Sequence, residues 1–212
     1  MTHTLHRQGS EQNLKGDFVL LAKAANNINE AGAADKLRQF LQMALRHGAI
    51  NMGHARVGNM YNLGTDEIIV RVSNNCTVTA VFDDLDRVTS FVQEVKDANL
   101  GMSVVISSLF HSSRECCARV GLAPHSIEHS LGVWGNRERL APQKELELTT
   151  MCGHGLISAN LVASLVEGIK SGQTTPDAAS LELAKQCQCG IFNPKRGAEL
   201  LRAMANLPTK PA

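Results

Sequence analysis

The chain has 212 residues, 43% of them hydrophobic, and its 21 Lys and Arg against 20 Asp and Glu give a net charge of +1. This length and apolar content suffice for one compact domain with a buried core, and the balanced charge gives no support for binding nucleic acid or an anionic membrane surface. No apolar run approaches the roughly 20 residues of a membrane-spanning helix. The N-terminus lacks the apolar stretch of a signal peptide, so we expect a cytoplasmic protein with reduced thiols.

The first region, residues 1–64, is expected to be helical. Apolar residues recur at spacings of three and four over residues 14–28 and again over residues 37–45, which is typical of two amphipathic helices. Residues 51–64 are rich in Gly and Asn and predict a loop that could serve as a lid or ligand loop. His3 and His6 precede the first helix, and we expect no functional role for them.

The second region, residues 65–142, alternates predicted strands and helices. Strands are expected at residues 77–82, 102–110 and 126–134, and the segments between them have helical spacing. Helices that cross over between strands indicate a small βαβαβ sheet with parallel strands. Ligands of such sheets bind beyond the carboxyl ends of the strands. Polar candidates in this region are Asp83, Asp84, His111, His125 and His129.

The third region, residues 143–212, is expected to be a helical unit carrying cysteine-rich turns. Thr175 with Pro176, and Asn193 with Pro194, have the residue types that begin helices. The predicted fold is therefore α/β: a helical N-terminal region, a small βαβαβ sheet and a C-terminal helical unit, together forming one compact domain.

The six cysteines of a reduced chain favour metal ligands or reactive thiols over disulfides. Cys152, Cys187 and Cys189 lie in glycine-flanked turns that we expect to open helices, where the helix dipole favours the thiolate. With Cys117 as a fourth ligand they would hold an iron–sulfur cluster of the 4Fe–4S type, or zinc. Cys116 and His154 are alternative fourth ligands, and Cys76 is interpreted as a small core residue.

Glycines beside these cysteines allow backbone N–H groups to turn toward a cofactor. We therefore expect Gly153, Gly155 and Gly190 to line the cofactor site, and Cys152 and His154 to take part in chemistry. Thiol redox chemistry is a further interpretation, although neither Cys116-Cys117 nor Cys187-Gln188-Cys189 has the spacing of a thioredoxin-like site. Buried cysteines without any ligand are the plain alternative.

The favoured interpretation is a metal- or iron–sulfur-binding oxidoreductase, or another cluster-dependent enzyme of small-molecule metabolism. Its partners would be a small-molecule substrate or a redox partner protein, and further copies of the chain in a homo-oligomer. A cluster carrier or a structural zinc protein would use the same ligands, and a structural zinc site would be closed by four of them.

The string Met151-Cys152-Gly153-His154-Gly155 resembles the first catalytic motif of the proline racemase family. The resemblance implies cofactor-free acid–base catalysis by two cysteines on opposite faces of an amino acid. Cys152 would be the first thiol, and His154 and Gly155 would belong to its anion-binding turn. Cys189-Gly190 partly matches the second motif, but the residues after it depart from the small residues of that family. The chain also lacks two similar halves, so a racemase or epimerase is kept as the rival interpretation.

Overall fold

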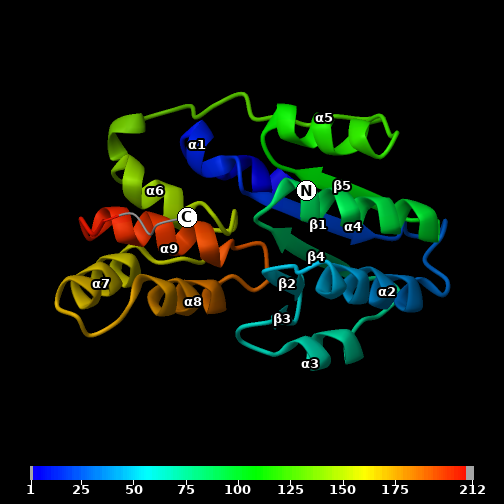
Figure 1. Cartoon of the computed structure of the whole chain (residues 1–212), viewed down its shortest axis with the longest axis horizontal. Helices are drawn as coiled ribbons and strands as arrows, with labels where there is room; N and C mark the ends of the chain where they lie inside the picture. The colour runs from blue at the N-terminus through cyan, green and yellow to red at the C-terminus, as the bar shows by residue number, and fades with distance from the viewer. Residues whose placement is uncertain (1, 209–212) are drawn as a thin grey trace.

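A five-stranded antiparallel sheet forms the centre of the structure, a computed structural model that describes residues 2–208 (Figure 1). Residues 1 and 209–212, which belong to the first and third expected regions, lie outside the described residues. The spatial order is β3-β2-β4-β1-β5, and every neighbouring pair is antiparallel. The strands are β1 (Phe18–Lys23), β2 (Asn51–His54), β3 (Gly58–Asn59), β4 (Thr77–Phe82) and β5 (Ser103–Ser107). The fold mixes helix and sheet as predicted, but the predicted parallel sheet is wrong.

Helices connect and flank these strands. In the described part of the chain, none of them is long and apolar enough to cross a lipid bilayer. They are the 3-10 helices η1 (Thr2–His6) and η2 (Arg137–Arg139), and the α-helices α1 (Glu11–Leu14), α2 (Ala33–Arg46), α3 (Thr65–Val70), α4 (Leu85–Ala98), α5 (Phe110–Arg119), α6 (Gln143–Thr149), α7 (Ala159–Lys170), α8 (Pro176–Gln186) and α9 (Pro194–Met204).

The antiparallel sheet arises because two crossover units interleave. β1 and β2 both run antiparallel to β4, so α2 joins two parallel strands that have β4 between them. β4 and β5 flank β1 in the same way and are joined by α4. This is the split βαβ arrangement, in which each unit leaves a gap that a strand of the other unit fills.

One strand that the sequence analysis missed is β1, because residues 14–28 were predicted to be one helix. The run Phe18-Val19-Leu20-Leu21-Ala22 is almost wholly buried, since β1 is covered on both faces. A strand covered on both faces has a continuous apolar run, which periodicity alone does not distinguish from a helix.

Two further expectations are corrected. The predicted loop over residues 51–64 contains the hairpin of β2 and β3, whose residues are all buried despite their Gly and Asn content. The strand predicted over residues 126–134 is absent: residues 121–140 are exposed throughout and contain only η2 as regular structure. His125 and His129 therefore lie in an irregular exposed segment, not on a sheet face.

Alternate residues of β1 and β4 face two separate cores. Leu20 pairs with Ala80 in the register, and both pack in the core beneath α2 and α4. Val19 pairs with Val81, and both pack on the other face with residues of the C-terminal helices. Figure 1 shows α6 to α9 grouped beside the sheet. The expected helix starts in this unit are confirmed, because Thr175 caps α8 and Asn193 caps α9 through their side chains.

A buried ion network holds the N-terminal segment on this assembly. The Asp17 carboxylate pairs with Arg7 and lies 3.0 Å from Arg196 Nη1. Arg7 also donates to the carbonyl oxygen of Ile191 at 2.7 Å. Burial alone would raise the pKa of Asp17, but the two guanidinium groups outweigh it and hold that pKa below its ordinary value. The network therefore ties η1 to β1 and to the start of α9.

We predict that Asp17→Asn will lower the free energy of unfolding at pH 7 by about 3–5 kcal/mol, because it leaves two buried cations without their counterion. Denaturant unfolding measures the change. Asp35→Asn is the matched control: Asp35 pairs with Arg38 at an exposed position, and its loss should cost less than about 1 kcal/mol.

The same substitution should change the acid side of the stability profile. The pKa of Asp17 is lower in the folded state, so its stabilisation is present above the unfolded pKa of about 3.9 and is lost as the pH falls through the folded value. The Asn variant should lack this contribution. Equal stability of Asp17→Asn and the wild type at neutral pH would contradict the role of the network.

Candidate metal centre

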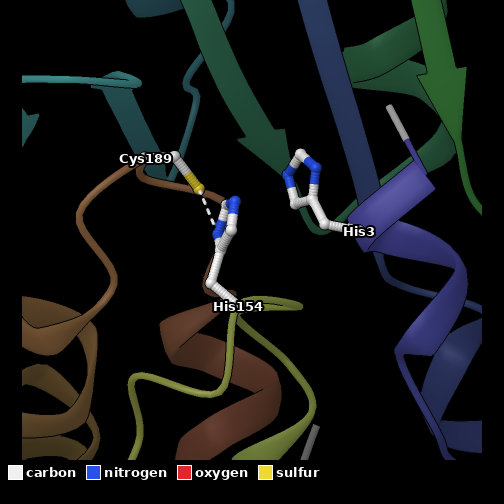
Figure 2. Close-up of side chains that lie close together, drawn as sticks. All are labelled: His3, His154 and Cys189. Atoms are coloured by element: carbon white, nitrogen blue, oxygen red, sulfur yellow. Dashed lines mark hydrogen bonds between the residues drawn. The ribbon is translucent and has the colours of Figure 1, made fainter.

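Two cysteine-containing turns and the N-terminal segment meet at one point of the structure. His3 of η1, His154 of the α6–α7 turn and Cys189 of the α8–α9 turn place one ligand atom each within 4.8 Å of the others (Figure 2). Cys189 Sγ lies 3.7 Å from His154 Nδ1. The two imidazole rings stack, with centroids 4.3 Å apart. Three segments that are distant in sequence thus converge on one group of nitrogen and sulfur donors.

The turn after α6 wraps its backbone around the Cys152 sulfur. Cys152 is fully buried, and its Sγ accepts hydrogen bonds from the backbone N–H groups of His154 at 3.3 Å and Leu156 at 3.2 Å. α7 begins only at Ala159, so Cys152 is not in the first turn of a helix as expected. Local N–H groups, not a helix dipole, surround this sulfur.

The second turn holds Cys187 and Cys189 with their sulfur atoms 4.0 Å apart. Cys187 is the C-cap of α8 and α9 begins at Pro194, so neither thiol lies in the first turn of a helix. A hydrogen bond from the Cys189 thiol, together with the N–H groups of Phe192 and Ile191, lowers the pKa of Cys187 to about 7. The same thiol–thiolate hydrogen bond and burial raise the pKa of Cys189. The two thiols are therefore coupled through one hydrogen bond.

His3 contributes a buried donor atom that has no partner. Its Nε2 is shielded from solvent and makes no hydrogen bond within the described residues. Burial, followed by the charge of His154, lowers the pKa of His3 to about 4. The ring is therefore neutral at pH 7, which is the form that binds metal ions. His154 is exposed, so one side of the group is open to solvent.

The structure brings most of the metal-ligand and cofactor-site candidates of the sequence analysis together and places Cys117 apart from them. Cys152, Cys187 and Cys189 lie in one core cluster, and Gly153, Gly155 and Gly190 belong to the two turns that carry them. Cys117 lies on α5, where it lines a separate cavity of about 680 Å³ with residues of α4 and β5. Its neighbour Cys116, and Cys76, belong to the core on the other face of the sheet.

His3 is the site residue that the sequence analysis missed. Nothing in its local sequence distinguishes it from His6, which is exposed in the same turn. Its place is set by contacts from distant segments. One of these contacts is with Gly153, whose φ of +70° and lack of a side chain allow close approach: a Cβ there would lie 2.2 Å from the carbonyl oxygen of His3.

We predict that Gly153→Ala will displace η1, whereas Gly155→Ala will not. Both glycines have positive φ, so each substitution should cost about 1–2 kcal/mol in backbone strain. Only the Gly153 side chain would meet η1, because a Cβ at Gly155 has no neighbour within 4 Å. Hydrogen exchange should show faster exchange of residues 3–7 in Gly153→Ala alone. Equal exchange in the two variants would contradict the docking of η1 on this turn.

Comparisons of the chain with protein-family descriptions, with curated proteins and with solved structures find no match. A proposal of function therefore depends on the geometry of these three segments.

Proposed function

We propose that this protein binds a single transition-metal ion, zinc being the best fit, through His3, His154 and Cys189. The observation that carries the proposal is the buried, unpartnered Nε2 of His3 beside a second imidazole and a thiol. A buried polar atom without a partner is costly, and a metal ion would satisfy it. Two imidazoles and a thiolate are donors that zinc accepts, and the Cys189 thiol would lose its proton on binding the ion.

The spacing of the donors supports one ion. Around a tetrahedral zinc ion with sulfur at about 2.3 Å and nitrogen at about 2.0–2.1 Å, two nitrogens lie roughly 3.3–3.4 Å apart, and a sulfur and a nitrogen lie roughly 3.5–3.6 Å apart. The separation of 3.7 Å between Cys189 Sγ and His154 Nδ1 is close to the sulfur–nitrogen value, and all three donor atoms lie within 4.8 Å of one another. An ion lies in the plane of each imidazole that binds it, so one of the two stacked rings must turn. His154 has the freedom to do so because it is exposed.

An iron–sulfur cluster is the second candidate. It is favoured by the backbone N–H groups that face all three sulfurs of Cys152, Cys187 and Cys189, as they do around cluster sulfurs. Two observations favour the single ion instead. In a four-iron cluster each thiolate binds a different iron, which spreads the sulfurs apart, whereas the sulfurs of Cys187 and Cys189 are only 4.0 Å apart. The expected fourth ligand, Cys117, lies at a separate cavity.

The open side of the group supports a catalytic ion over a purely structural one. Structural zinc sites are closed by four protein ligands, whereas catalytic sites keep a position for water. A pocket of about 310 Å³ lies beside the same turn, where Gly153 and Gly155 line it together with His6 and Glu145, but none of the three donor residues lines it. We propose a metal-dependent enzyme of small-molecule metabolism, in which the ion activates a bound water or polarises the substrate.

The racemase interpretation has less support. A thiol that exchanges a proton with the α-carbon of a substrate must reach it, and Cys152 is fully buried with its sulfur hydrogen-bonded to two backbone N–H groups. Cys189 is also buried. Thiol chemistry on a substrate would require both turns to open.

The proposal predicts that anaerobically purified wild-type protein binds one zinc ion per chain, and that His3→Ala lowers the affinity at least about 100-fold, because a directly bound ligand should matter more than an outer-shell partner. Elemental analysis and competition with a chelator measure both values. His6→Ala is the matched control, since His6 is exposed in the same turn of η1 and should bind zinc as the wild type does.

Three results would count against this centre. Iron with acid-labile sulfide would establish the cluster in place of the single ion. Absence of bound metal, or zinc binding unaffected by His3→Ala, would overturn the proposed site.

A further inference from the structure

Buried side chains from two strands hold the backbone of the cysteine turn, residues 187–190. Asn59, at the end of β3, donates from Nδ2 to the carbonyl oxygens of Ala184 at 2.9 Å and Cys187 at 2.7 Å. Thr79, in β4, donates from its hydroxyl to the carbonyl oxygen of Cys189. Asn59 and Thr79 are both almost completely buried. Each of the two cysteines thus has its own carbonyl fixed by one side chain.

The effect of these bonds extends to the sulfurs. Fixing the carbonyl of a residue restrains its Cα–Cβ bond, and so the direction of its thiol. The Ile191 carbonyl is held by Arg7 in the same way, and the N–H group of that peptide unit, which belongs to Phe192, faces the Cys187 sulfur. C=O and N–H point in opposite directions within this peptide unit, so its carbonyl is held away from the sulfur that its N–H faces. The N–H of the Cys189–Gly190 peptide instead donates to the Cys187 carbonyl oxygen at 3.0 Å, which closes the turn.

The glycines of the contact make this arrangement possible. A Cβ on Gly53 of β2 would lie 2.4 Å from the Cys189 carbonyl oxygen, and a Cβ on Gly190 would lie 2.6 Å from the Met52 carbonyl carbon. The turn therefore rests with its backbone directly on the sheet, within reach of the short Thr79 side chain.

We propose that Thr79 and Asn59 are positioning residues of the metal centre, which aim the Cys189 sulfur at His154 and His3. This inference rests on the proposed function. Neither residue contacts the ion; both act through the backbone of the cysteines. Outer-shell partners of this kind typically change metal affinity 10- to 100-fold when they are removed.

The test compares Thr79→Val with Thr79→Ser. The valine variant keeps the shape of the side chain and removes the hydroxyl donor, whereas the serine variant keeps the donor. We expect Thr79→Val to bind zinc about 10- to 100-fold more weakly and to weaken the thiolate-to-metal absorption band of the cobalt-substituted protein. Thr79→Ser should restore both towards wild-type values, which a loss of packing alone would not do.

A second pair tests Asn59. Asn59→Asp replaces the two donated hydrogen bonds with a carboxylate facing carbonyl oxygens and should weaken zinc binding further. Asn62→Asp is its control: exposed Asn62 donates to Lys185, outside the cysteine turn, at 2.8 Å, and the oxygen that accepts from the Asn59 N–H is kept in the carboxylate. Hydrogen exchange of the metal-free proteins should show faster exchange of residues 187–192 in Thr79→Val and Asn59→Asp.

The outcomes separate the two proposals. Wild-type protein that binds no zinc overturns the proposed function, and the positioning of a metal centre with it. Zinc binding by the wild type that Thr79→Val and Asn59→Asp leave unchanged, in affinity and in the cobalt spectrum, overturns the positioning role alone.

Discussion

The direct backbone contact between Gly53 and Gly190 is the constraint on which the candidate site depends. A side chain at either position would collide with main-chain atoms of the other segment, so the cysteine turn can lie on β2 only because both residues are glycine. That contact places the Cys189 carbonyl at Thr79 and its sulfur beside His154. The sheet thereby serves as the rigid support of a site whose donors come from two turns and the helix η1.

The N-terminal segment completes the site through a second constraint, the ion network around Asp17. Arg7 joins Asp17 to the Ile191 carbonyl, so one side chain links η1 to the peptide that follows the cysteine turn. His3 is carried on the same helical turn, against Gly153. Buried charges of this kind add little net stability on average, but they fix geometry because an unpaired charge in the interior is costly. Their arrangement here explains how a terminal histidine is held near two distant turns.

The parts of the fold set by local sequence were predictable. Thr175 and Asn193 begin helices because their side chains accept from the first-turn amides, a short-range interaction that residue type reveals. The topology of the sheet was not predictable in this way. Residues 18–22 suit a helix or a strand covered on both faces, and only the pairing with β4 and β5 decides between them.

The candidate site likewise contains residues that local sequence selected and one residue that it could not select. Residue type and flanking glycines were enough to select the turns with Cys152, His154 and Cys189. His3 could not be selected, because its position depends on long-range contacts of Arg7 and Gly153. Cys117 was selected for its chemistry alone, and it lies on α5 beside another cavity.

X-ray absorption spectroscopy of the zinc-loaded protein tests the central claim most directly, because it reports the atoms bound to the ion. The account predicts a shell with sulfur at about 2.3 Å and nitrogen at about 2.0–2.1 Å, with the outer scattering of two imidazoles. A first shell of oxygen and nitrogen without sulfur, or one without imidazole scattering, would contradict a centre built from His3, His154 and Cys189.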